Sequence, residues 1–234
     1  MGLLSTILDL NTYLEITTNT TGGTYAQAQD LSFKTCMRLV YRTSMAPDRD
    51  GLPIDFASET DDIDPQLAEI RRRGLTFDLV FLDAHHTYAC AARDLAAAYS
   101  LLGDGGVLVV HDCNPPNRQM AAPDYFDGSW CGVTYKSFID FCLGNPSFDF
   151  LTFDADFGCG IIMKPRGPLQ IAENKARARR DEALLARWSE ATRDYDTAYA
   201  MFRENRQALL HLVDFAGLRA RLAPRLTFEA TPAF

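Results

Sequence analysis

One stretch, residues 77–113, constrains the fold of this chain more than any other. It begins with the short apolar run Leu79–Leu82, which ends at Asp83. A run of that length between polar residues is typical of a strand buried on both faces. Apolar residues at helical spacing follow from Thr87, and then comes a second apolar run, Val107–Val110. The spacing predicts a strand–helix–strand unit whose strands are parallel, with a right-handed crossover.

Polar side chains follow both of these strands. Asp83 is followed by His85 and His86, and the second strand is followed by His111 and Asp112. Ligands of open parallel sheets bind beyond the carboxyl ends of the strands. We therefore expect the functional site at this edge of the sheet.

The rest of the chain is predicted to extend this unit into an α/β sheet with helices on both faces. Further strands are expected at residues 12–17, 33–41, 52–57, 148–153 and 160–163, the last two as an antiparallel pair. Helices are expected at residues 24–31, 58–74 and 133–143. Glycines 103, 105 and 106 are expected to end the central helix, and the long loop 114–132 is expected to form a lid or a binding wall.

The C-terminal part of the chain differs in composition. From about Leu169 it is rich in Ala, Arg and Glu, and large apolar residues recur at spacings of three, four and seven, among them Trp188, Tyr195, Tyr199 and Phe202. That pattern predicts amphipathic helices that pack on their own domain or form a homodimer contact. We therefore divide the chain into a Rossmann-like domain, residues 1–166, and a C-terminal helical appendage, residues 167–234.

Composition argues against several classes of protein. The net charge of −8 disfavours nucleic-acid binding through phosphate neutralisation. No apolar run approaches the roughly 18 residues of a membrane span. The six cysteines form no CxxC pair, as is usual for reduced thiols in a cytoplasmic protein. We expect a cytoplasmic protein whose partner is a small molecule, with no nucleic acid and no membrane.

Several segments resemble the class I S-adenosylmethionine-dependent methyltransferases, particularly the small bacterial family that includes sugar and natural-product O-methyltransferases. YLEITTNTTGGT (13–24) is similar to the first motif of that family, FDLVFLDAHHTY (77–88) to its D-G-D-H-S-Y motif, and GGVLVVHDC (105–113) to its GG-strand-HD motif. The resemblance implies a Rossmann-like class I methyltransferase fold, with a seven-stranded, mostly parallel sheet and a C-terminal helical appendage.

The resemblance also implies a site for S-adenosyl-L-methionine. The residues that it places there are Glu15, Thr17, Asn19, Gly22, Gly23, Ser58 and Asp83. Two features depart from the family pattern. Thr17 stands where the first motif has a glycine, and no acid ends the second strand, where Arg38 is the nearest charged residue. A β-branched residue at the glycine position adds bulk beside the cofactor.

The two central strand ends are the candidate catalytic site. Asp83 and Asp112 end neighbouring strands about 4.8 Å apart, so that their carboxylates could share a hard divalent cation such as Mg²⁺. In the resembling metal-dependent sugar methyltransferases, the residue that matches His86 is the general base, a role that suits an imidazole. His85 replaces the family's usual acid. The structural alternative is that each carboxylate caps the following segment and that His86 binds backbone.

We expect methyl transfer from S-adenosylmethionine to a hydroxyl of a small molecule, a sugar or a secondary metabolite, with Mg²⁺ as an optional second cofactor. An alternative from another class is a methyltransferase-like protein that has lost the cofactor and acts as a binding or scaffold subunit. A third hypothesis keeps the rim of Asp83, His86 and Asp112 for other metal-assisted chemistry.

Overall fold

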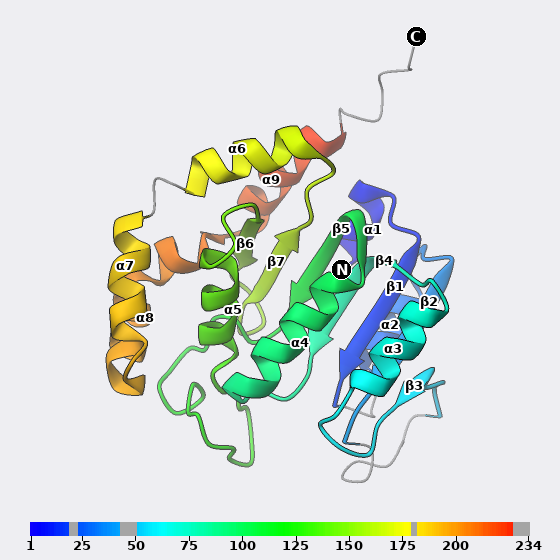
Figure 1. Ribbon diagram of the computed structural model, residues 1–234, viewed down its shortest axis with the longest axis horizontal. Coiled ribbons are helices and arrows are strands. Elements are labelled where there is room, and N and C mark those ends of the chain that lie inside the picture. Colours follow the sequence, from blue (N-terminus) through cyan, green and yellow to red (C-terminus); the bar gives the residue numbers. More distant parts are fainter. Residues whose placement is uncertain (19–22, 43–50, 179–181, 227–234) are drawn as a thin grey trace.

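The parallel part of the sheet is built from short apolar strands. The computed structural model describes residues 1–18, 23–42, 51–178 and 182–226. In this part of the chain, β1 pairs in parallel with β2 and β4, and β4 pairs in parallel with β5. The parallel strands are β1 (Thr12–Thr17), β2 (Thr35–Val40), β3 (Phe56–Ala57), β4 (Phe77–Asp83) and β5 (Leu102–Val110). Their carboxyl ends all lie at one edge (Figure 1).

The sheet is completed by strands from the second half of the chain. Strands β6 (Asp149–Phe153) and β7 (Cys159–Met163) form a hairpin. This hairpin joins the sheet where β7 pairs with β5 in the antiparallel direction. A two-residue strand, β8 (Leu212–Val213), pairs in parallel with β6. The described strands have the order β3-β2-β1-β4-β5-β7-β6-β8. This confirms the Rossmann-like methyltransferase fold, with β8 as an eighth strand beside the seven that were expected.

Helices cover both faces of the sheet, because alternate residues of each buried strand point to opposite sides. On one face, Val80 and Leu108 pack against α3, α4 and α5, which lie in front of the sheet in Figure 1. On the other face, Leu79 and Val109 pack with α1, α2 and α9. These helices are α1 (Gly2–Leu8), α2 (Gly23–Gln29), α3 (Asp64–Arg72), α4 (Tyr88–Ser100), α5 (Thr134–Leu143) and α9 (Phe215–Leu226).

The start of β5 differs from the sequence prediction. The strand begins at Leu102 rather than Val107, so Gly103, Gly105 and Gly106 belong to it. The pairing of β4 with β5 shifts register after Phe77, and Gly105 has a left-handed φ of 77°. A Cβ at Gly106 would lie 3.1 Å from the Phe77 carbonyl oxygen. The glycines therefore permit a bulge and a close backbone approach inside the strand. Glycine is also common at helix ends, which is why the sequence pattern indicated the end of a helix here.

The apolar stripe of the C-terminal segment packs on its own chain. The segment forms α6 (Pro168–Ala178), α7 (Glu182–Ala191) and α8 (Tyr195–Leu210) before β8 and α9. Trp188 is 1% exposed and Phe202 is fully buried, both in the core that includes α5. The Trp188 indole donates to Asp140 Oδ1 of α5 at 2.6 Å. Of the two expectations for this stripe, packing on its own domain therefore applies. A homodimer contact through these helices stays a prediction.

Among the described residues, no helix combines the length and the apolar character that a bilayer crossing requires.

Candidate active site

The ends of β4 and β5 bring the predicted catalytic residues together. Leu82 and Val110 are partners in the parallel ladder, so the residues that follow them, Asp83 and His111, lie side by side. Asp112 then adopts a left-handed φ of 62°, a conformation that aspartate tolerates better than most residues. After this turn, the Cys113 amide donates to the Gly158 carbonyl oxygen at 2.9 Å, which ties the segment to the turn between β6 and β7.

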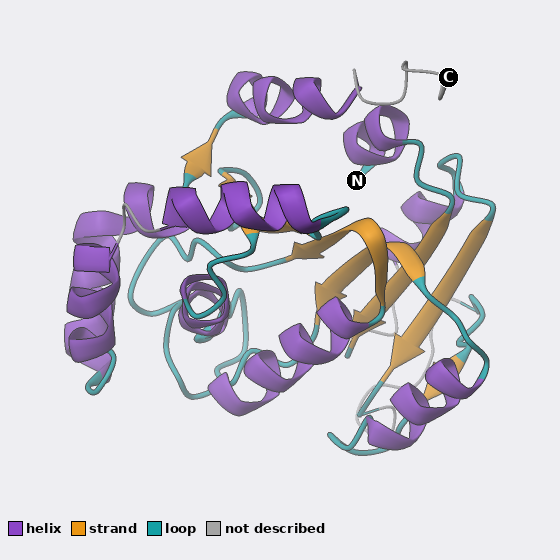
Figure 2. Ribbon diagram, turned by 45° about the horizontal axis from the view of Figure 1, so that its top comes forward, coloured by secondary structure: helices purple, strands orange, loops and turns teal. Residues whose placement is uncertain are grey.

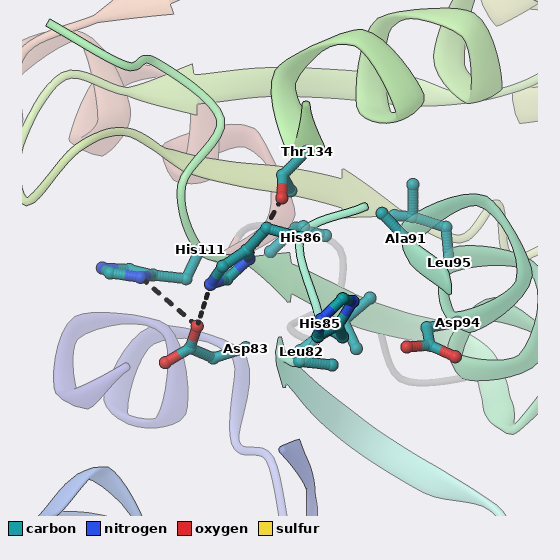
Figure 3. Close-up of a pocket in the computed structure, with 11 residues that line it drawn as sticks. Leu82, Asp83, His85, His86, Ala91, Asp94, Leu95, His111 and Thr134 are labelled. Carbon is teal, nitrogen blue, oxygen red and sulfur yellow. Dashed lines mark hydrogen bonds and ion pairs between the residues drawn. The ribbon is translucent and has the colours of Figure 1, made fainter. Parts of the chain in front are cut away.

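Four side chains form a compact cluster at this edge, and we call Asp83, His86, His111 and Asp112 the rim cluster. His86 Nε2 lies 3.2 Å from Asp112 Oδ2 and 3.9 Å from Asp83 Oδ1. His111 Nδ1 lies 3.4 Å from Asp112 Oδ1 and 3.6 Å from Asp83 Oδ1. Figure 3 shows both imidazoles turned toward Asp83, whereas His85 lies apart from them on the side of Asp94. The sequence prediction that Asp83, His86 and Asp112 share one site is thus consistent with their positions.

His86 is held in place by the segment that leads into α5. Its Nδ1 lies 3.1 Å from the Thr134 hydroxyl, and its carbonyl oxygen accepts from the Val133 amide at 2.9 Å. Its ring meets the Trp130 ring edge to face at 5.4 Å. Gly132 has a φ of 57°, and a Cβ there would lie 2.3 Å from the His86 carbonyl oxygen. When Nδ1–H donates to Thr134, Nε2 is the nitrogen that can take up a proton, and it would then donate that proton to Asp112 Oδ2.

The carboxylates and imidazoles of the rim cluster stabilise one another's ionised forms. Burial acts to raise the pKa of Asp83, but the neighbouring His111 and His86 outweigh it and lower the pKa. Burial acts to lower the pKa of His111, but Asp112 and Asp83 outweigh it and raise the pKa to about 12. Nε2 of His111 also lies 3.2 Å from Asp156 Oδ2. His111 is therefore a cation that positions carboxylates rather than a proton acceptor.

The rim cluster also has a donor set that fits a divalent cation. Asp83, His86 and Asp112 each offer one ligand atom, and these atoms lie within 4.8 Å of one another. Carboxylate oxygens suit Mg²⁺, and an added imidazole suits first-row transition metals.

The described residues among those expected at the cofactor site lie at the same edge or just inside it. Thr17 is 1% exposed and is the ladder partner of Asp83. Glu15 is 3% exposed and accepts from the Tyr13 hydroxyl at 3.0 Å, two residues before the end of β1. Gly23 begins α2, and a Cβ added there would meet no described atom within 4 Å. Asn19 and Gly22 lie outside the described residues.

Ser58 orders the loop that follows β3. Its hydroxyl donates to the Asp62 carbonyl oxygen at 2.7 Å and accepts from the Thr60 amide at 3.3 Å. A cofactor contact for Ser58 stays a prediction.

The end of β2 lacks an acid of its own, but the fold brings Asp94 and Asp61 there. Tyr41 follows the strand, and its hydroxyl donates to Asp94 at 2.6 Å and accepts from the His85 amide at 2.9 Å. Arg42 pairs with Asp61 from the loop after β3. Arg38, by contrast, is fully buried within the strand, with its guanidinium over the Tyr25 ring. Arg38 therefore lies away from the open edge.

Sequence reasoning missed three side chains that shape the site. Trp130 and Thr134 hold His86, and Asp156 pairs with His111. The only signals were the aromatic residue near the end of the long loop and the acidic turn between the last two strands. Neither signal indicates that Trp130 contacts His86 or that Asp156 contacts His111, since those contacts depend on the tertiary fold.

The strand order places β7 between β5 and β6, antiparallel to β5, and the parallel strands end at a polar edge. These two features define the fold as that of a class I methyltransferase. Residues 24–113 match the family described as a methyltransferase domain. This span runs from α2 through the rim cluster. The match confirms the resemblance to a methyltransferase domain over the part of the chain that holds the motifs 77–88 and 105–113.

Part of the backbone is also similar to solved structures at low sequence identity. An O-methyltransferase from Bacillus cereus, in complex with S-adenosylhomocysteine, is 18% identical, with 69% of this chain and 76% of that chain covered and a TM-score of 0.44. The O-methyltransferase TomG from Streptomyces achromogenes is 17% identical, with coverages of 70% and 77% and a TM-score of 0.46. The methyltransferase PaMTH1 from Podospora anserina is 18% identical, with coverages of 68% and 74% and a TM-score of 0.49. No curated protein matches the sequence significantly.

Proposed function

We propose that the protein is an S-adenosylmethionine-dependent methyltransferase that methylates a hydroxyl group of a small molecule. One observation supports this most strongly. Inside the segment that matches the methyltransferase domain, His86 Nε2 lies 3.2 Å from Asp112 and 3.9 Å from Asp83, at the carboxyl edge of parallel strands. Ligands of such sheets bind at this edge.

The residues at this edge fit the proposed cofactor. Thr17 and Asp83 are adjacent at the ends of β1 and β4, and a Cβ at Gly23 would have no described atom within 4 Å. When bound, S-adenosylmethionine supplies an electrophilic methyl group. The chain itself must then align the acceptor oxygen with that group and remove the hydroxyl proton.

His86 is placed for the removal of this proton. The pKa of an aliphatic hydroxyl is far above 7, so a positioned base is needed as the new bond forms. Nε2 of His86 accepts the proton, while Thr134 holds the opposite nitrogen at 3.1 Å. Asp112, 3.2 Å from Nε2, stabilises the imidazolium that results. Asp83 and Asp112 would hold a divalent cation without His86, whose Nε2 is needed as the base, and the charge of this cation would lower the pKa of a bound hydroxyl.

The loop 114–132 holds the proposed base in position. Trp130 lies edge to face with both His85 and His86, and Tyr125 packs on Trp130 from outside. The Tyr195 hydroxyl of α8 donates to the Ala121 carbonyl oxygen, which anchors the loop to the C-terminal helices. A base fixed in this way is aligned with the acceptor oxygen, and alignment is a large part of the rate in such displacements.

Transfer of an isotopically labelled methyl group from S-adenosylmethionine to a panel of hydroxylated small molecules tests this function. With an acceptor found, we expect Asp112→Asn to raise the Mg²⁺ concentration needed for half-maximal rate by roughly 10- to 100-fold, because one metal ligand loses its charge. Asp104→Asn, at an exposed position near the opposite end of β5, is the control and should change nothing. A rate that survives both EDTA and Asp112→Asn would contradict a role for the metal ion. The absence of labelled product across the panel would count against the proposed methyltransferase function.

A further inference from the structure

A cavity of about 460 Å³ lies on the face of the sheet opposite α4. Its walls come from α1, through Leu3 and Leu4, from α9, through Leu218, and from the sheet, through Val109 and Ile161. Figure 2 shows α1 and α9 together above the sheet. Eleven of the sixteen lining residues are apolar. The volume falls within the range of small-molecule sites, about 300–1,000 Å³.

The polar residues of this cavity are concentrated at the rim cluster. Asp83 and His111 line it there, together with Asp156, whose carboxylate lies 3.2 Å from His111 Nε2. The other two polar residues, Thr24 and Gln27, belong to α2, the helix that follows the expected cofactor loop. The cavity thus connects an apolar chamber to the carboxylates at the ends of β4 and β5.

We propose that this cavity binds the apolar body of the methyl acceptor, so that the substrate is a hydroxylated, largely apolar molecule and not a sugar. This assignment rests on the function proposed above. Away from the rim cluster and the Met1 amino group, the walls from α1, α9 and the sheet present apolar side chains, so most hydroxyls of a sugar would lose their hydrogen bonds to water there. An aromatic or aliphatic body instead gains from the same burial.

The arrangement also fixes the direction of binding. Asp83 belongs to both the rim cluster and the cavity wall, so a hydroxyl at the polar end lies beside the proposed catalytic groups. The apolar body then extends between α1 and α9. Ala155 and Phe215 line the cavity where it is exposed to solvent, with Phe215 53% exposed.

Binding of 2-naphthol, a planar apolar molecule with one hydroxyl, tests the proposal by calorimetric titration of the full chain. Ala155→Trp should block the cavity and weaken 2-naphthol binding at least about tenfold, since a large ring takes up the space of the ligand body. Ala186→Trp, the same change on the exposed surface of α7, should leave the affinity unchanged. Methyl α-glucoside should show no binding. Intermolecular nuclear Overhauser effects from 2-naphthol to the Leu218 methyl groups provide a readout that depends on no variant.

Equal affinity of the Ala155→Trp and wild-type proteins, tighter binding of the glucoside than of 2-naphthol, or the absence of Overhauser effects to Leu218 would overturn the assignment. Titration with S-adenosylhomocysteine separates this proposal from the function beneath it. Binding of S-adenosylhomocysteine without 2-naphthol would overturn the cavity assignment alone. Binding of 2-naphthol without S-adenosylhomocysteine would overturn the methyltransferase function while leaving an apolar ligand site.

Discussion

Replacing His86 with alanine is expected to reduce turnover with a verified acceptor by about 10²- to 10⁴-fold, the usual contribution of a positioned general base. Nε2 of His86 is the imidazole nitrogen that faces both Asp83 and Asp112 while the opposite nitrogen is held by Thr134. His111 is not placed to substitute for it, because its Nε2 is paired with Asp156 and its Nδ1 faces Asp112 and Asp83. The affinity for S-adenosylhomocysteine should change by less than about twofold, since the proton acceptor acts on the other substrate.

The neighbouring histidine provides the matched control. His85 packs on the same Trp130 ring, but its Nδ1 lies 3.1 Å from the Thr87 hydroxyl and its side chain lies apart from the rim cluster (Figure 3). Steady-state rates of His85→Ala should therefore stay close to the wild-type rates. Turnover of His86→Ala that equals that of His85→Ala would mean that the rim cluster is structural and that alignment alone accounts for the rate.

Replacing Trp188 with alanine is expected to lower the free energy of unfolding by about 3–5 kcal/mol, the usual cost of removing a buried tryptophan. The side chain is 1% exposed, and its indole nitrogen donates to Asp140 of α5 at 2.6 Å. The substitution removes a large apolar group and leaves Asp140 Oδ1 without that donor. Urea unfolding, followed by circular dichroism, measures the change.

Leu185→Ala is the control for this prediction. It lies one turn earlier on α7 and is 37% exposed, so its loss should cost clearly less than that of Trp188. Similar unfolding midpoints for the two variants would show that the C-terminal helices contribute little to the stability of the sheet domain.

Local pattern was sufficient to predict the elements that build the site. The apolar run before Asp83 and the helical spacing after Thr87 predict β4 and α4, and the structure confirms both. Parallel pairing then places Asp83 beside His111 and Asp112 without further information. Strand ends in a parallel sheet can be predicted in this way, because the crossover rule fixes their common edge.

Contacts between distant segments could not be predicted in the same way. Asp61 lies about twenty residues after the strand end that it reaches through Arg42, and Asp156 reaches His111 from a hairpin turn. The helix α1 was missed as well, although its Leu4 and Leu8 are buried against the sheet. Its seven residues are too few to establish a helical period.

Titration calorimetry with S-adenosylhomocysteine, on protein shown by mass spectrometry to be free of retained ligand, tests the central claim most directly. A methyltransferase with Thr17 beside Asp83, and with no described atom within 4 Å of a Cβ at Gly23, should bind one equivalent per chain, with a dissociation constant of about 100 µM or lower. Saturating ligand should also raise the melting temperature, because it binds only the folded chain. The absence of both heat and thermal stabilisation at millimolar ligand would contradict the cofactor assignment and favour a binding or scaffold subunit on the same fold.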